Sequence, residues 1–361
     1  MRVTSWFRQK GGPVFLAAFG VLACCLTVLP GQARAAGVNL TLSPLPVNLV
    51  TSPGSSVSTS LKVQNSGSEA VKLQVTLMKF KADSTNGQAT LVPFKDGEEE
   101  KNWVTFSKTN FTAQPGVFNT VDMTINAPAT AAFGYYYAVV FSQQGTDPTK
   151  PQSNKVNGAV ASLILLDVQA PGEKREAQVT SFTATKKLYQ YLPASFDVTV
   201  KNTGNVHVKP SGNIFVGRGV NGNFIDTLTI NPGGGNILPG SSRTFNVEWD
   251  NGFPAYTVKK QNGQIVTDNV GKPVKTLNWN LSNLNHLRFG KYNASLTLVY
   301  NDGKRDVPVN GQVSFWVIPW LPILIILVLV LLALAGLWSM LRHTFGTDKR
   351  ETARKRYSRR S

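Results

Sequence analysis

One stretch near the C-terminus, from Ile318 to Met340, constrains this chain more than any other feature of its sequence. No charged residue lies between Asp306 and Arg342, and the middle of the stretch is entirely apolar. As a helix, these 23 residues would extend ~34 Å at ~1.5 Å per residue, enough to cross a hydrocarbon core of ~30 Å. We therefore predict a transmembrane helix over residues 317–341, with a buried core helix as the alternative.

The residues that flank this stretch predict how it would lie in a membrane. Tryptophans stand at both ends, where amphipathic rings favour the membrane–water interface: Trp316, Trp320 and Trp338. The tail over 342–361 has eight basic residues against two acidic ones. Its basic residues are Arg342, Lys349, Arg350, Arg354, Lys355, Arg356, Arg359 and Arg360. The positive-inside rule then predicts a single-pass type I protein of the plasma membrane, with its tail in the cytoplasm.

The N-terminal 35 residues have the pattern of a secretory signal peptide. Arg2, Arg8 and Lys10 precede a mostly apolar run over residues 14–29, and a small-residue cleavage motif ends at Ala35. We expect cleavage after Ala35 or the alanine that follows it, with lipidation or a retained anchor as alternatives. Both cysteines lie inside this segment, so the mature chain has none and cannot depend on disulfide bonds.

The charge of the chain is concentrated at its two ends. Of the formal net charge of +17, the signal peptide contributes +4 and the tail +6, which leaves +7 over the roughly 280 residues between them. That length suffices for two domains of ordinary size. A thinly spread excess of this kind suits an anionic cell envelope and does not indicate nucleic-acid binding.

The sequence between the signal and the span is rich in strand patterns. Apolar and polar residues alternate over 57–63 and 71–78, which is typical of strands with one buried face. Residues 134–141 are among the most apolar and predict a central strand. Short strands separated by turn-forming residues, with no helical pattern between them, continue to residue 168. We therefore predict an Ig-like β-sandwich over residues 36–168.

A second sandwich is expected after a polar linker that contains proline and glycine, at residues 169–176. The second domain is predicted over residues 177–316. Within it, residues 251–273 form an inserted hairpin or loop whose role the sequence does not indicate. The predicted fold class is all-β, with two tandem Ig-like antiparallel β-sandwich domains followed by a single transmembrane α-helix.

A weak internal repeat indicates that the two domains are copies of one fold. Residues 61–67 (LKVQNSG) resemble residues 198–204 (VTVKNTG), and each run ends in Asn-Ser/Thr-Gly. Downstream, Pro115-Gly116 and Pro239-Gly240 each precede a strand. The shared pattern is a strand, a turn that needs a positive φ at or near glycine, and the next strand of the sandwich.

The arrangement resembles the WxL-interacting surface proteins of Gram-positive bacteria. The likeness rests on the strand and turn at 62–67, the segment 103–106, the Pro-Gly step into a strand at 115–125 and the strand at 134–141. The second domain, the span and the basic tail occupy the corresponding places. The resemblance implies a DUF916-like first domain associated with peptidoglycan and WxL-protein binding, and a second domain associated with host surfaces. The 251–273 insertion departs from that pattern and leaves the second domain's ligand open.

The sequence has no catalytic or metal-binding pattern. His207 and His286 are the only histidines between signal and span and have no spaced ligand partner, so we expect His207 to be a solvated strand residue. The acidic run at 96–100 lacks the spacing of a calcium loop, and no nucleophile elbow or phosphate-binding loop is present. We predict no enzyme activity, no metal site and no cofactor.

The aromatic run Tyr135, Tyr136 and Tyr137 is the candidate binding cluster. In a strand, Tyr135 and Tyr137 share one face and Tyr136 takes the other. One interpretation packs one side in the core and leaves the other half-exposed. The other makes the rings a platform for a glycan or a partner protein.

These features predict a non-enzymatic, membrane-anchored cell-surface protein that binds peptidoglycan or another wall polymer, or a wall-associated surface protein. No Leu-Pro-x-Thr-Gly sorting motif precedes the span, so we expect the protein to stay in the membrane. Three alternatives remain: an adhesin for another cell surface, an accessory subunit of a membrane complex that acts through its helix, and an enzyme.

Overall fold

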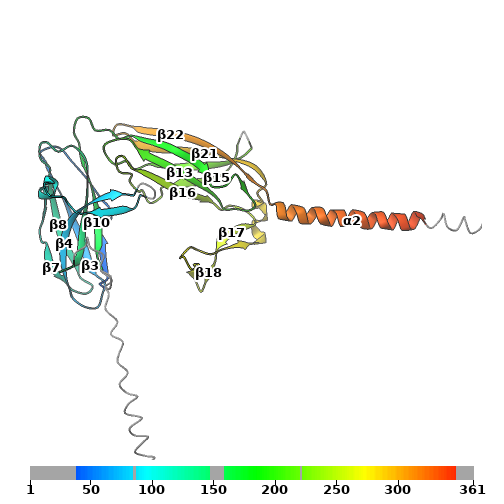
Figure 1. Ribbon diagram of the computed structural model, residues 1–361, viewed down its shortest axis with the longest axis horizontal. Coiled ribbons are helices and arrows are strands. Elements are labelled where there is room, and N and C mark those ends of the chain that lie inside the picture. Colours follow the sequence, from blue (N-terminus) through cyan, green and yellow to red (C-terminus); the bar gives the residue numbers. More distant parts are fainter. Residues whose placement is uncertain (1–37, 84–86, 147–157, 220–221, 347–361) are drawn as a thin grey trace, which may run out of the picture.

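The computed structural model describes residues 38–83, 87–146, 158–219 and 222–346. They form two β-sandwich domains and one long helix, α2 (Trp320–Gly346), which extends from the second domain (Figure 1). The predicted fold class, all-β sandwiches followed by a single apolar helix, is confirmed. The predicted signal peptide and the tail beyond residue 346 lie outside the described residues.

Two sheets form the first domain. One has the spatial order β1 (Leu40–Ser43), β3 (Ser56–Asn65), β8 (Phe118–Asn126) and β6 (Val104–Phe106). The other has the order β2 (Val47–Thr51), β10 (Val160–Val168), β9 (Phe133–Gln143), β4 (Val71–Ala82) and β5 (Ala89–Val92), and β7 (Asn110–Ala113) also pairs with β4. A short 3-10 helix, η1 (Glu99–Trp103), precedes β6.

The second domain also has two sheets. One has the order β11 (Ala177–Ala184), β13 (Ala194–Asn202) and β16 (Ser242–Trp249). The other has the order β12 (Leu188–Tyr189), β22 (Asp306–Val317), β21 (Gly290–Asn301), β14 (Ser211–Arg218) and β15 (Asn223–Ile230). The insertion predicted over residues 251–273 is longer in the structure, since it extends from the end of β16 at Trp249 to the start of β21 at Gly290. It adds two small antiparallel pairs, β17 (Ala255–Val258) with β20 (Lys275–Asn278) and β18 (Lys260–Gln261) with β19 (Gln264–Ile265), and then η2 (Leu281–His286).

The two domains share one topology. In each, the first strand pairs within one sheet, and the next short strand joins the other sheet, parallel to that domain's last strand: β2 to β10, and β12 to β22. These two pairs depart from the antiparallel pairing that the sequence predicted. In the first domain the link between β1 and β2 is residues 44–46. So short a link spans the ~10 Å between sheets and leaves no length for a reversal.

The predicted internal repeat corresponds to a buried asparagine in each domain. Asn65 ends β3, where its Nδ2 donates to the carbonyl of Ala113 at 3.1 Å and its Oδ1 accepts from the amide of Gly67 at 2.9 Å. Asn202 ends β13, where its Nδ2 donates to the carbonyl of Ile237 at 2.8 Å and its Oδ1 accepts from the amide of Gly204 at 2.8 Å. Both side chains are fully buried.

The Pro-Gly pairs of the repeat lie against the same asparagines. The amide of Gly116 donates to the carbonyl of Asn65 at 2.8 Å, and the amide of Gly240 donates to that of Asn202 at 3.1 Å. Each asparagine therefore ties together the end of one strand, the turn that follows it and the approach to a later strand. The asparagine side chains also pair backbone groups of the turns, such as the amides of Gly67 and Gly204, which folded proteins rarely leave without a partner.

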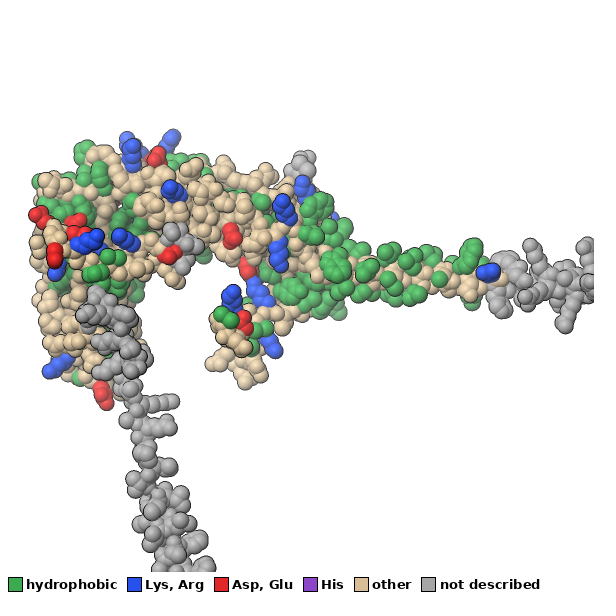
Figure 2. Space-filling model, in the orientation of Figure 1, with side chains coloured by type: hydrophobic (Ala, Val, Ile, Leu, Met, Phe, Trp, Pro, Cys, Tyr) green, Lys and Arg blue, Asp and Glu red, His purple; other side chains and the backbone are tan. Residues whose placement is uncertain are grey.

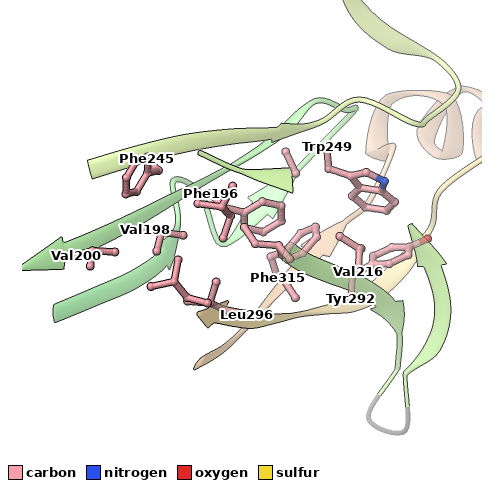
Figure 3. Packing of buried hydrophobic residues seen from close by; sticks show 14 of the residues in the cluster. Phe196, Val198, Val200, Val216, Phe245, Trp249, Tyr292, Leu296 and Phe315 are labelled. Atoms are coloured by element: carbon pink, nitrogen blue, oxygen red, sulfur yellow. The ribbon is translucent and has the colours of Figure 1, made fainter. Parts of the chain in front are cut away.

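Each sandwich has its own hydrophobic core. In the second domain, four aromatic side chains meet between the sheets: Phe196 of β13, Trp249 of β16, Tyr292 of β21 and Phe315 of β22 (Figure 3). Phe196 and Phe315 have ring centroids 5.3 Å apart, and Trp249 and Tyr292 are 5.2 Å apart. Tilted and edge-on aromatic contacts at such distances stabilise a core beyond simple burial.

The helix α2 contributes to neither core. Its stretch Trp320–Arg342 is long and apolar enough to cross a membrane by length and composition, and none of its most apolar window is buried. The strand β22 ends at Val317 and α2 begins at Trp320, so residue 317 belongs to the sandwich. A chain cut after Pro319 would keep both domains intact.

Candidate functional site: the cleft between the domains

The outer face of the sheet β2-β10-β9-β4-β5 is apolar. Met78 and Phe80 of β4, Ala138 and Val140 of β9, and Leu165 of β10 point away from the core of the first domain and are nonetheless buried. The outer face of a sandwich sheet usually faces water, and its polar residues alternate along each strand with the apolar residues of the core. An apolar outer face over three adjacent strands needs a cover.

The second domain covers part of this face. Leu238, in the loop between β15 and β16, belongs to the same buried cluster. The ring of Tyr136 packs edge-on against Phe80 on one side and His207 on the other, with centroids 6.0 and 5.9 Å away. Asn236 Nδ2 donates to Asn48 Oδ1 at 3.4 Å. The two sandwiches therefore meet as an elbow, which Figure 1 shows.

An ion pair fixes the linker at the elbow. Arg175 of the linker pairs with Asp167 of β10 and, through Nε, with Glu173 at 2.7 Å. The Asp167 side chain is 2 % exposed. Burial raises its pKa, and the charge of Arg175 lowers it in part. A carboxylate buried this deeply depends on its partner to offset the cost of burying its charge.

His207 is a correction to the sequence prediction. Its neighbours Val206 and Val208 are buried, so alternation placed the histidine in solvent. Instead, its ring lies against Tyr136 of the other domain. Burial, and then the charge of Arg175, lowers the pKa of His207 to about 4. It is therefore neutral at neutral pH, and it forms part of the interdomain contact.

Where the second domain does not cover the apolar face, a cleft of about 320 Å³ remains. Its floor is formed by Phe80, Leu163 and Leu165 of the first domain, and Leu238 and Arg243 of the second domain line the opposite side. The cleft therefore has an apolar floor and a cation at its rim. Grooves of this kind accept a hydrophobic side chain, with a polar group to fix its orientation.

Arg243 of β16 is the one cationic side chain among the described residues that line the cleft. Its guanidinium carbon lies 5.4 Å from the centre of the Phe245 ring, and its Nη1 lies 3.5 Å from the carbonyl of Asn236. A Cβ built on Gly235 would be 2.2 Å from Nη1, and one on Gly87 would be 2.9 Å from Cδ. Arg243 therefore occupies space that a side chain would need at Gly87 of the first domain or at Gly235 of the second.

The predicted tyrosine cluster lies partly in this interface. Tyr137 is 1 % exposed in the core of the first domain, where it stacks on Phe94 at 6.2 Å. Tyr135 is half-buried on the same face, edge-on to Trp103 at 4.9 Å. Tyr136 faces the second domain. The rings are thus packed on both faces of β9 and form no solvent-exposed aromatic platform.

The other predicted residues lie at the helix. Trp316 lies near the end of β22, Trp320 begins α2 and Trp338 lies near the far end of α2. All three side chains are exposed. Arg342 is on the last turns of α2. The remaining topology residues, Lys349, Arg350, Arg354, Lys355 and Arg356, lie outside the described residues.

The described residues also form a polar hollow in the first domain. A polar cleft of about 770 Å³ lies at the turn that follows Asn65, lined by residues 65–72 and 143–145. Among the residues that the structure describes, no group of three or more His, Cys, Asp or Glu could hold a metal ion.

One local pattern in the sequence indicates part of the interdomain cleft. Residues 163–166 (LILL) are apolar at four successive positions, which is typical of a strand buried on both faces. Leu163 and Leu165 come from that run. Leu238 and Arg243 carry no comparable signal, because they reach the cleft only through the way the domains pack.

Comparison with known proteins assigns this chain to no family. No protein-family model and no curated protein matches this sequence. The class 5 fimbrial chaperone CfaA is 17 % identical with a TM-score of 0.33, covering 66 % of this chain and 98 % of that one. The CsuC–CsuE chaperone–tip adhesion subunit complex of Acinetobacter baumannii is 10 % identical with a TM-score of 0.33, covering 75 % of this chain and 97 % of that one. The CupB2 chaperone of Pseudomonas aeruginosa is 11 % identical with a TM-score of 0.32, covering 75 % of this chain and 98 % of that one.

Proposed function

We propose that this protein is a non-enzymatic, membrane-anchored surface protein that binds a wall-associated protein in the cleft between its two domains. The observation that carries the proposal is the apolar floor at Phe80, Leu163 and Leu165, left open beside the second domain. α2 would hold the protein in the plasma membrane, with both sandwiches outside and the basic tail in the cytoplasm. This topology and the WxL-interacting resemblance remain predictions.

The chemistry of the cleft favours a polypeptide over a wall polymer. An apolar floor gains free energy by removing an aliphatic or aromatic side chain from water, whereas a glycan has mostly hydroxyl groups. Arg243 at the rim could donate to a carboxylate or a backbone carbonyl of the same partner. The charged rim would fix the orientation of a side chain that the floor holds by burial.

The edge strand β5 offers main-chain hydrogen bonds beside the cleft. Among the described strands, β5 pairs only with β4, so its other side is free. Leu91 of β5 lies opposite Phe80 and shares the apolar face. A partner segment that extended the sheet at β5 would place alternate side chains over this face.

The test uses the fragment of residues 38–319, which retains both cores and lacks the helix. The purified fragment is applied to isolated cell walls, with and without their attached proteins, at low and high salt. We expect retention only on walls that keep their proteins. Leu163→Glu, which puts a charge on the cleft floor, should abolish retention. Phe118→Glu, a charge at an exposed site of the first domain, should leave it unchanged; circular dichroism checks that both variants are folded.

Other outcomes would identify the other candidate functions. Equal retention on protein-free walls would make the protein a polymer binder and refute a protein ligand. Loss of retention with Phe118→Glu as well would show that the contact lies elsewhere. Capture of a partner by the full chain in detergent, but not by the fragment, would identify an accessory subunit that acts through α2. Binding to other cells but not to walls would identify an adhesin.

A further inference from the structure

The segment between β20 and β21 exposes large apolar side chains. Leu281, Leu284 and Leu287 are 72, 57 and 54 % exposed, and Trp279 is 54 % exposed. Phe289 is also exposed. The three leucines are spaced three residues apart, the repeat of a 3-10 helix, in and just after η2. A contiguous apolar surface of this kind usually marks an interaction site.

The same segment is held firmly to the second domain. The backbone of Leu287 forms an isolated β-bridge with Phe253. The ring of Trp279 packs edge-on against the rings of Phe253 and Tyr191, with ring centroids 5.9 and 6.2 Å away. The Asn280 side chain accepts from the amide of Ser282 at 3.2 Å and begins η2. The apolar side chains therefore project from a fixed support.

This surface lies beside the start of α2. Gly290, which follows Phe289, pairs with Val317, the last residue of β22. The amide of Ile318 donates to the carbonyl of Tyr189 at 2.8 Å, and Pro319 is buried, so the helix leaves the domain through a short, tied connection. Figure 2 shows apolar side chains gathered where the helix meets the second domain. If α2 crosses a bilayer, the surface of that bilayer must lie at this end of the domain.

Basic residues surround the same end of the domain. Lys291 pairs with Trp316 across β21 and β22, the carbonyl of Lys187 accepts from the amide of Trp316 at 2.9 Å, and Arg218 pairs with Tyr292. All three basic side chains are exposed. Cations at this level can meet lipid phosphates, while the apolar side chains beside them enter the boundary of the acyl chains.

We propose that residues 279–289 form a membrane-docking surface, which inserts into the interfacial layer of the bilayer that α2 crosses. The occupant is the lipid bilayer itself, because the surface is continuous with the only apolar helix among the described residues. Docking gives the second domain a second attachment to the membrane, in addition to α2. This assigns the last part of the insertion, beyond β20, a role that does not depend on what the cleft binds.

The test uses the full chain in lipid nanodiscs, with Cys24→Ser and Cys25→Ser as the background. Leu284→Cys carries an environment-sensitive fluorophore. The matched control is Ile265→Cys, a site 53 % exposed in the same insertion, on β19, which pairs with β18. Figure 1 places β18 away from the start of α2. Lipids with a quencher near the top of the acyl chain are added to both samples.

We expect emission from position 284 to shift to the blue and to be quenched about twofold, since an interfacial apolar face lies roughly 5–10 Å into the headgroup boundary. Emission from position 265 should stay unchanged. Equal quenching at both positions, or none at 284, would overturn the proposal. A blue shift at 284 without lipid quenching would also overturn it, because a second copy or a protein partner would then cover the surface. Circular dichroism of each labelled chain shows whether it is folded.

Discussion

Removal of the linker cation should open the elbow between the domains. In Arg175→Met, the carboxylate of Asp167, only 2 % exposed, loses its partner. Leaving a charge buried without a counterion costs about 3–5 kcal/mol, and the lower part of that range applies because Arg175 is itself 22 % exposed. The chain can avoid this cost by separating the domains, since separation lets water reach Asp167. The stability lost in Arg175→Met therefore cannot exceed the free energy of the interdomain contact.

Fluorescence energy transfer within the fragment of residues 38–319 measures this opening. The fragment has no native cysteine, so labels can be placed at Phe118→Cys in the first domain and Ile265→Cys in the second, both more than half exposed. The variant should give a broader distance distribution and a lower urea midpoint. Arg305→Met is the matched control, because Arg305 lies 3.8 Å from Asp302 and is 81 % exposed. An ion pair this exposed to solvent contributes little to stability, so Arg305→Met should leave both measurements close to those of the unsubstituted fragment.

A second substitution separates charge from packing. Asp167→Asn combined with Arg175→Met removes the buried charge together with its partner, so most of the lost stability should return and the distance distribution should narrow again. The reasoning is refuted if Arg175→Met leaves both measurements unchanged. It is also refuted if the double variant is as open as the single one, because packing of the arginine stem would then hold the elbow.

Three other predictions follow from the same structure. Asn202→Ala leaves the carbonyl of Val206 and the amide of Gly204 without their hydrogen-bond partner, and should lower the free energy of unfolding by about 3 kcal/mol. Asn301→Ala at an exposed turn should cost less than ~1 kcal/mol, and urea denaturation compares the two variants. Because the pKa of His207 is lowered to about 4 in the folded protein, the folded state binds fewer protons than the unfolded state between pH 6.5 and 4. The free energy of unfolding should therefore fall as the pH is lowered through this range, by ~2 kcal/mol at pH 5, and His207→Phe should flatten this slope. Gly134→Ala would put a Cβ 2.2 Å from the Tyr136 hydroxyl and should cost ~1–3 kcal/mol in thermal unfolding, part of which Tyr136→Phe restores.

The repeat shows what the sequence could predict. Asn-Ser-Gly and Asn-Thr-Gly after a strand are local patterns, and the structure places Asn65 and Asn202 in equivalent positions with equivalent bonds. The apolar helix was predictable for the same reason, because length and composition within one segment define it. Features that depend on neighbours along the chain could thus be predicted.

The interdomain site was less predictable because its contacts are remote in sequence. Alternation placed His207 correctly on the face opposite Val206 and Val208, and only the identity of what covers that face was wrong. The same holds for Tyr136, which was expected to face away from Tyr135 and Tyr137. A pattern of alternation distinguishes two faces of a strand but does not distinguish solvent from a second domain.

The two proposed sites lie at opposite ends of the second domain. The turn between β21 and β22 lies at the elbow, where a Cβ on Gly303 would be 3.8 Å from Arg175, and β22 then runs the length of the second domain to α2 (Figure 1). Its 12 residues at ~3.3 Å each extend ~40 Å. If residues 279–289 rest on the bilayer, the cleft at Leu163 stands roughly that far above it. A partner of the cleft must therefore reach well beyond the lipid headgroups, as a wall-associated protein would. This separation makes the two proposals independent: Leu163→Glu should leave lipid quenching at position 284 unchanged, and a charge at Leu284 should leave capture by the cleft unchanged.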